Sequence, residues 1–193
     1  MHVDASSLQG DETLEADVCI VGAGPAGLTL AAELSGSGVA TVIVESGGWT
    51  ADPVAQELNH ALIEGDRHQP LDKTRHRQIG GTATLWNTPV PPTAGARFVP
   101  LDPLDFRGER GRAAWPITFE EMTPYYLRAQ QVAGLGRFDY DAASWQLPPS
   151  PIPADHEVMA SRIYQFGSAE RFRQEIPEQL ARSPTVTLCS NAT

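Results

Sequence analysis

The stretch Asp17–Ser46, DVCIVGAGPAGLTLAAELSGSGVATVIVES, predicts the fold of this chain. A short apolar run, Val18–Val21, leads into the turn Gly22–Gly27, whose glycines have the spacing G-x-G-x-x-G. A segment compatible with a helix follows, and a second apolar run, Val39–Val44, ends in Glu45. Strand, tight turn, helix, strand and terminal acid stand in the order of a dinucleotide-binding βαβ unit. We therefore predict an α/β fold with a Rossmann-like core.

Each glycine of this turn has a physical role in binding a dinucleotide. Gly22 permits the sharp turn out of the strand, Gly24 lets a pyrophosphate approach the backbone, and Gly27 lets the helix pack close to the strand. The helix N-terminus presents unpaired N–H groups and a partial positive charge to the phosphates. A glycine-rich turn in an ordinary α/β protein is the alternative, which the surrounding pattern disfavours.

The acid at the end of the second strand indicates which dinucleotide binds. Glu45 can accept hydrogen bonds from the ribose hydroxyls. Its charge would repel a 2′-phosphate, because two anions would then lie side by side. The sequence therefore favours FAD or NAD over NADP as the ligand.

The composition excludes several classes of partner. The 193 residues carry a net charge of −10, which argues against nucleic acid or an anionic membrane surface as partner. No apolar run is long enough to span a bilayer and the N-terminus has no signal pattern, so we expect a cytoplasmic protein. The histidines lack metal-ligand spacing, and no metal site is expected. Residues 1–15 are polar and are predicted to form a flexible arm.

Helix signals are clear in the middle of the chain. The segment Thr118–Glu121 fits a capping box, and Pro124 restarts the pattern as a first helical residue. Gly134 fits the position just after a helix end. Tyr125, Leu127 and Val132 of this helix are expected in the core.

Other segments give weaker signals. Residues 54–65 are weakly helical, and residues 89–103 are rich in proline, which favours extended backbone. A helix over residues 170–181 should be kinked or divided by Pro177. The strand at residues 185–188 would be an exposed edge unless more protein follows. We therefore expect the chain to be the N-terminal part of a longer protein, an incomplete domain.

Three motifs resemble those of glucose–methanol–choline (GMC) type flavoproteins, in particular their pyranose-oxidase-like and sugar-dehydrogenase-like members. The first is Val18–Gly48, and the second is Arg75–Asn87, RHRQIGGTATLWN, which resembles the family's loop beside the flavin. The third is Trp115–Gly134, with its W-P, P-Y-Y and late glycine. Val186–Thr193 also resembles the family strand that passes the adenine. The resemblance covers most of residues 17–136.

The resemblance implies FAD as cofactor and a sugar, glycoside or alcohol as substrate, oxidised at a CH–OH group by hydride transfer to the flavin. It implies that residues 16–193 are the N-terminal portion of an FAD-binding domain, with the start of a substrate or cap region at about 89–155. FAD should be bound non-covalently, since Leu85 stands where some members carry a histidine bonded to the flavin. The predicted cofactor-binding residues are Gly22, Gly24, Pro25, Ala26, Gly27, Glu45, Ser46, Arg77, Gly80, Gly81, Thr82, Thr84, Leu85, Trp86 and Asn87.

The resemblance places the family's catalytic histidine and its partner residue beyond Thr193, so no residue of this chain is predicted to be catalytic. Two other functions stay open. One is a non-catalytic FAD-binding subunit of a split flavoprotein, with a second chain supplying the catalytic half. The other is a different FAD enzyme such as a monooxygenase, because many flavoproteins share the first motif.

Overall fold

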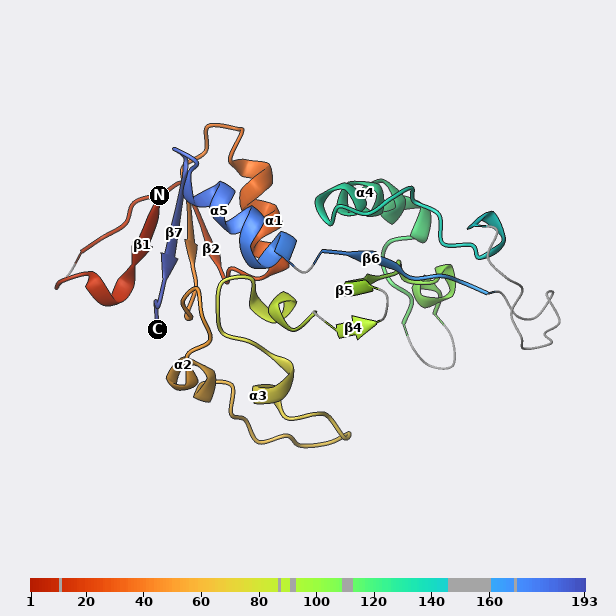
Figure 1. Ribbon diagram of the computed structural model, residues 1–193, viewed down its shortest axis with the longest axis horizontal. Helices are drawn as coiled ribbons and strands as arrows, with labels where there is room; N and C mark the ends of the chain where they lie inside the picture. The colour runs from red at the N-terminus through yellow and green to blue at the C-terminus, as the bar shows by residue number, and fades with distance from the viewer. Residues whose placement is uncertain (11, 87, 91–92, 109–112, 146–160, 169) are drawn as a thin grey trace. The chain divides into compact units, whose positions relative to one another are not determined.

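The computed structural model describes residues 1–193 except 11, 87, 91–92, 109–112, 146–160 and 169 (Figure 1). The chain divides into two compact units. One contains Met1–Thr88 and Ala169–Thr193, and the other contains Pro89–Ser168. The second unit begins near the start of the predicted cap region, and its role in substrate binding stays a prediction.

The first unit is built on a parallel four-stranded sheet with the strand order β1-β7-β3-β2. The strands are β1 (His2–Asp4), β2 (Val18–Val21), β3 (Thr41–Val44) and β7 (Val186–Ser190). In the middle of the sheet, Ile43 of β3 pairs with Ile20 of β2 on one side and with Leu188 of β7 on the other. Because all strands are parallel, their carboxyl ends meet at one edge of the sheet, where α/β proteins bind ligands.

Two helices lie together on this sheet (Figure 1). Helix α1 (Pro25–Leu34) connects β2 to β3 and packs on both strands, while α5 (Ile176–Ala181) packs on β7 and on α1. Their buried residues include Leu28, Ala31 and Leu180. This parallel sheet with its covering helices confirms the predicted α/β, Rossmann-like core.

The helix predicted over residues 170–181 changes its hydrogen-bond pattern just before its proline. A π-helical turn, Arg171–Glu175, precedes α5, and Pro177 stands in the first turn of α5. The helical backbone continues from one segment into the next, since the N–H of Ile176 donates to the carbonyl oxygen of Arg171. The predicted irregularity near Pro177 is therefore present as a change of helix type, but residues 170–181 are not divided into separate helices.

The first residues of the chain contradict the prediction of a flexible arm over residues 1–15, because residues 2–7 form regular secondary structure. His2–Asp4 form β1, which pairs with β7, and the amino group of Met1 donates to the carbonyl oxygen of Val186 at 2.6 Å. The prediction fails here because β7 offers unpaired backbone groups that the first residues of the chain satisfy. As a consequence, β7 is paired on both sides and is not the exposed edge that the sequence suggested.

The segment after β3 contains less helix than predicted. Helix α2 (Pro53–Glu57) covers only the start of residues 54–65, and α3 (Leu71–Thr74) follows later. Val54 and Leu58 are both exposed. A short helix without a buried apolar face has little to stabilise a longer run.

The second unit contains a three-stranded sheet and one long helix. The sheet order is β4-β5-β6, and β5 and β6 are antiparallel. The elements are β4 (Thr88–Val90), β5 (Thr93–Phe98), β6 (Gln165–Gly167) and α4 (Phe119–Val132). The extended backbone predicted for the proline-rich stretch is confirmed by β5.

Helix α4 begins and ends where the sequence predicts. The Thr118 side chain accepts the N–H of Glu121 at 3.2 Å, and the Glu121 carboxylate accepts the N–H of Thr118 at 2.8 Å. At the other end Gly134 has φ +66°, and the N–H of Leu135 donates to the carbonyl oxygen of Gln130 at 2.9 Å. The capping box and the glycine stop are both confirmed.

Two predictions for α4 are wrong. The helix runs through Pro124 without a restart, because the capping box has already fixed its start more than one turn earlier. Tyr125 and Leu127 are 59% and 47% exposed rather than buried. The unit instead packs a series of aromatic side chains against one another, formed by Phe106, Trp115, Phe119, Tyr126, Phe138 and Tyr140.

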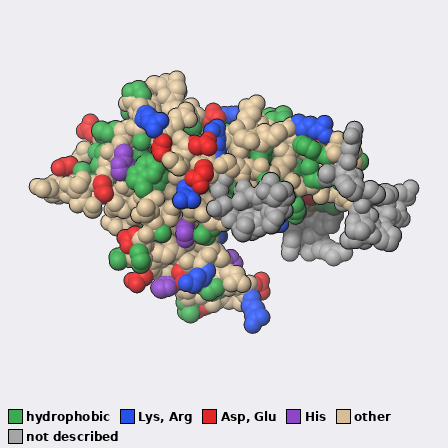
Figure 2. Space-filling model, viewed as in Figure 1, with side chains coloured by type: hydrophobic (Ala, Val, Ile, Leu, Met, Phe, Trp, Pro, Cys, Tyr) green, Lys and Arg blue, Asp and Glu red, His purple; other side chains and the backbone are tan. Residues whose placement is uncertain are grey.

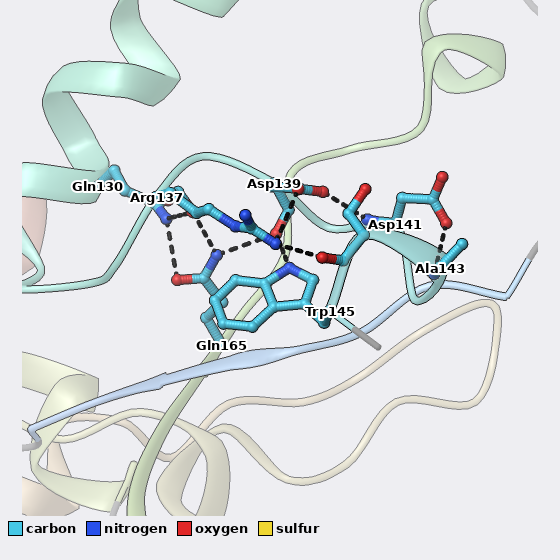
Figure 3. A network of polar contacts seen from close by, with 8 residues as sticks. Gln130, Arg137, Asp139, Asp141, Ala143, Trp145 and Gln165 are labelled. Carbon is cyan, nitrogen blue, oxygen red and sulfur yellow. Dashed lines mark hydrogen bonds and ion pairs between the residues drawn. The ribbon is translucent and has the colours of Figure 1, made fainter. Parts of the chain in front are cut away.

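A polar network fixes the loop that follows α4 (Figure 3). Gln165 of β6 accepts a hydrogen bond from Gln130 at 3.0 Å and donates to the carbonyl oxygen of Arg137 at 2.7 Å. Trp145 donates to the carbonyl oxygen of Asp139 at 3.0 Å, and the guanidinium of Arg137 lies over the indole ring. Because the buried amides are paired, the network stabilises this unit.

Candidate functional site

A cavity of about 560 Å³ lies at the carboxyl ends of the parallel strands. Its wall combines the residues that end β2 and β3 with the residues that follow β7. The lining residues are Val21, Gly22, Val44, Glu45, Ser46, Leu58, His76, Arg77, Ala192 and Thr193. This is the position at which open α/β sheets bind their ligands.

The glycine turn beside this cavity has the geometry that the sequence predicts. Gly22 has φ +100°, in the left-handed region that favours glycine. A Cβ atom on Gly27 would lie 2.0 Å from the carbonyl oxygen of Gly22, so α1 approaches β2 as closely as only glycine allows. A Cβ atom on Gly24 would meet no atom within 4 Å, so the space beside its backbone is open to a ligand.

The N-terminus of α1 is arranged to bind an anion. Gly24 is the N-cap residue and offers no side chain, and Pro25 takes the first helical position. The N–H groups of Ala26 and Gly27 have no intrahelical carbonyl partner, because they belong to the first turn. Together with the helix dipole they can hold a phosphate.

Glu45 joins β3 to the glycine turn. The side chain is only 6% exposed, and its carboxylate accepts the N–H of Ala23 at 2.8 Å and the N–H of Gly47 at 3.0 Å. Since a carboxylate oxygen can accept more than one hydrogen bond, capacity for a ribose hydroxyl is left. Contact of Glu45 with a ribose stays a prediction.

The second glycine segment lies directly against the first. The N–H of Gly80 donates to the carbonyl oxygen of Ala23 at 2.8 Å. Gly81 has φ +54°, and a Cβ atom on it would lie 2.9 Å from Cα of Gly24. The two motifs, distant in the sequence, therefore form one continuous structure at the turn.

The residues after this contact continue away from the turn in a 3₁₀ helix, Gly81–Leu85, which contains Thr82. Thr84 donates to the carbonyl oxygen of Gly81 at 2.8 Å, and its hydroxyl lies 2.8 Å from Nδ1 of His76. Trp86 meets the ring of Phe172 edge-on. Asn87 lies outside the described residues, and an approach of Thr84, Leu85 and Trp86 to the flavin stays a prediction.

Arg77 has partners that the sequence did not reveal. Its guanidinium donates to Ser46 Oγ at 3.0 Å and to Asn59 Oδ1 at 2.9 Å, and its backbone N–H donates to Gln56 Oε1 at 3.2 Å. These contacts hold α2 and the residues after it beside the end of β3. Asn59 and Gln56 belong to no motif, so only the structure shows that they shape the wall of the cavity.

A family model described as an FAD binding domain matches residues 15–63. The matched residues include the glycine turn and Glu45. The match indicates an FAD-binding domain in this part of the chain. Its cofactor is FAD, in agreement with the cavity, the open glycine backbone and the uncapped helix N-terminus. The match ends before the second glycine segment. It therefore supports FAD binding, and it does not show whether the chain is of the GMC type. No curated protein matches the chain.

Two other features are absent from the described residues. Within them, no group of three or more His, Cys, Asp and Glu side chains could hold a metal ion. No helix in the described part of the chain is both long and apolar enough to cross a membrane. On the face shown in Figure 2, Lys and Arg side chains are interspersed with Asp and Glu.

Proposed function

We propose that this chain is the FAD-binding part of an oxidoreductase that oxidises a CH–OH group of a sugar, glycoside or alcohol. The observation that carries the proposal is the hydrogen bond from Gly80 to Ala23, with Gly81 against Gly24. This contact brings residues 75–86, which belong to the segment resembling the flavin loop of GMC-type enzymes, beside the turn that would accept the pyrophosphate.

The residues of the first unit would hold FAD without a covalent bond. The backbone at Gly24 and the N–H groups of Ala26 and Gly27 would bind the pyrophosphate, and Glu45 the ribose. Ala192 and Thr193 supply the remaining wall of the cavity, where the adenine would lie. Leu85 offers no nucleophile for a bond to the flavin.

Bound FAD supplies a two-electron acceptor for the hydride of the substrate. The contribution of this chain to that chemistry is binding and electrostatics. The backbone N–H groups of the Gly81–Leu85 segment suit the extra negative charge of a reduced flavin. The proposal assigns no general base to this chain, so the base comes from polypeptide outside residues 1–193.

An anaerobic spectral titration tests the proposal. The product of the intact gene, loaded with FAD, is mixed with a panel of sugars and alcohols, and the flavin absorbance is followed. We expect at least one sugar or alcohol to bleach the flavin, and we expect residues 1–193 loaded with FAD to stay unbleached with the same compound. Bleaching of the intact product by NADPH alone would contradict the proposal and favour a monooxygenase.

The alternative role as a non-catalytic subunit has a separate outcome. If the intact gene ends at Thr193 and its product copurifies with a second chain, the base belongs to that chain. Bleaching by a sugar only after the two chains are combined would then identify a split flavoprotein. Bleaching by neither sugar nor NADPH would exclude both enzyme classes for this product.

A further inference from the structure

The N-terminal strand contacts the segment that forms one wall of the cofactor cavity. In β1, His2 is paired with Leu188 of β7 and Asp4 is paired with Ser190. The chain then passes through Asn191 to Ala192 and Thr193, which line the cavity. β1 is therefore held beside the exact residues from which the wall begins.

The side chains strengthen this connection at the end of β7. Asn191 Nδ2 lies 3.0 Å from each carboxylate oxygen of Asp4 and donates to them. His2 Nε2 lies 2.9 Å from Ser190 Oγ. Hydrogen bonds from Ser6 and then from Asn191 hold the pKa of the Asp4 carboxyl below its usual value. The acceptor of the Asn191 amide is thus a carboxylate, which forms a stronger hydrogen bond than a neutral group.

Asn191 has an unusual backbone conformation. Among the described residues it is the one non-glycine residue with a positive φ, +55°. Asparagine tolerates this left-handed conformation better than most residues, but a local cost is still paid. Contacts of the side chain with neighbouring groups can offset that cost.

The left-handed turn at Asn191 directs the chain toward Glu45. The N–H of Asn191 donates to the carbonyl oxygen of Gly47, and the N–H of Ala192 donates to the carbonyl oxygen of Glu45, both at 3.0 Å. The side-chain oxygen of Asn191 lies close to Gly48, where a Cβ atom would be 3.0 Å away. The orientation of Asn191 therefore decides where Ala192 meets the cavity.

We propose that Asp4, acting through Asn191, is a positioning residue for the adenosine half of FAD. Asp4 lies outside the cavity and holds the Asn191 amide, which fixes the left-handed turn and with it the wall formed by Ala192 and Thr193. The inference rests on the placement of adenosine in this cavity, which is part of the proposed function. β1 thereby becomes a part of the cofactor site rather than only a fourth strand.

Calorimetric titration of the folded chain with FAD, and separately with ADP, tests the inference. Asp4→Ala and Asn191→Gly should each raise both dissociation constants about three- to fivefold, since each removes the charge-assisted contact between the Asn191 amide and the Asp4 carboxylate. The double variant should be no weaker than either single variant, because both changes break the same contact. Asp4→Asn, which keeps an acceptor oxygen, should restore most of the affinity.

Two further variants distinguish an effect of Asp4 on FAD affinity from an effect on stability alone, and from a wrong placement of adenosine in the cavity. Ser6→Ala removes the hydroxyl donor to Asp4 at 2.7 Å, keeps the backbone N–H of residue 6 and the Asn191 contact, and should leave both dissociation constants unchanged. Unchanged constants in Asp4→Ala together with a lower unfolding midpoint, or additive effects in the double variant, would overturn the inference. Glu45→Ala should weaken FAD in any case; if it does not, the placement of adenosine fails, and the inference fails with it.

Discussion

The carboxylate of Glu45 accepts a hydrogen bond of 2.8 Å from the backbone N–H of Ala23, which joins the end of β3 to the turn after β2. Its other oxygen accepts the N–H of Gly47. The acid that the sequence assigns to the ribose is thus also a structural link between β3 and the glycine turn. Removing the charge of Glu45 should therefore lower both the stability of the fold and the affinity for FAD.

Glu45→Gln removes the charge and one acceptor oxygen of the side chain but keeps its shape. The amide keeps one oxygen but places an NH₂ group opposite the N–H of either Ala23 or Gly47. Because two donors then face each other in a buried place, we expect the free energy of unfolding to fall by about 1–3 kcal/mol. Denaturant unfolding without FAD measures this change. Glu57→Gln, on the exposed side of α2, is the control, and an equal effect of both variants would contradict the structure.

Gly27→Ala tests the close approach of α1 to β2. The added methyl group would lie 2.0 Å from the carbonyl oxygen of Gly22, so the helix must shift. We expect a loss of about 1–3 kcal/mol in the free energy of unfolding, typical of overpacking. Gly36→Ala is the matched control, since a Cβ atom there meets nothing within 4 Å. Equal stability of the two variants would show that the helix does not pack as described.

Gly81→Ala tests the contact between the two glycine segments. Gly81 has φ +54°, and a Cβ atom added to it would lie 2.9 Å from Cα of Gly24. Alanine at this position is therefore both strained and crowded. We expect weaker FAD binding as well as lower stability. Gly65→Ala is the control, because Gly65 has φ +92° but open surroundings. It should lose about 1–2 kcal/mol of stability from backbone strain alone and bind FAD like the wild type. Loss of FAD affinity in both variants would contradict the contact.

The burial of Tyr140 predicts that the second unit loses stability at alkaline pH. Burial raises the pKa of Tyr140 above its ordinary value of 10.0, while its hydroxyl donates to Gln130 Oε1 at 2.9 Å. The folded state therefore favours the protonated phenol. The resulting stability is fully present below pH 10 and is lost as the pH rises through the raised pKa of the folded state.

Denaturant unfolding between about pH 8 and pH 11 checks this prediction by comparison of Tyr140→Phe with the wild type. At the lower pH the variant should be less stable by about 1 kcal/mol, since Gln130 loses its donor. The difference between the two proteins should shrink as the pH rises. Tyr125→Phe, at an exposed position, should run parallel to the wild type throughout. A constant difference for Tyr140→Phe would contradict the prediction.

Local signals in the sequence predicted the elements well. The glycine turn, the capping box at Thr118, the stop at Gly134 and the irregular helix near Pro177 each depend on a few neighbouring residues. Backbone geometry and hydrogen-bonding capacity at such positions are properties of the residue types themselves. For that reason they can be read without knowledge of the tertiary structure.

Contacts between distant residues were not predictable in the same way. Nothing in the sequence of His2–Asp4 shows that β7 is its partner, so the first residues were expected to be flexible. Likewise, the apolar character of Tyr125 and Leu127 predicted burial, but the face of α4 that packs is set by the aromatic cluster. The polar wall around Arg77 depends on Asn59 and Gln56, which form no recognisable pattern.

Titration of Gly24→Ala with FAD tests the central claim most directly, namely that the pyrophosphate lies against the backbone of Gly24. Gly24 has φ −79° and open space around a would-be Cβ atom, so alanine should leave the free energy of unfolding unchanged. The same methyl group would occupy the place of the phosphates, and we expect the dissociation constant of FAD to rise at least about tenfold, or 1.4 kcal/mol. A variant that binds FAD as tightly as the wild type would contradict the claim.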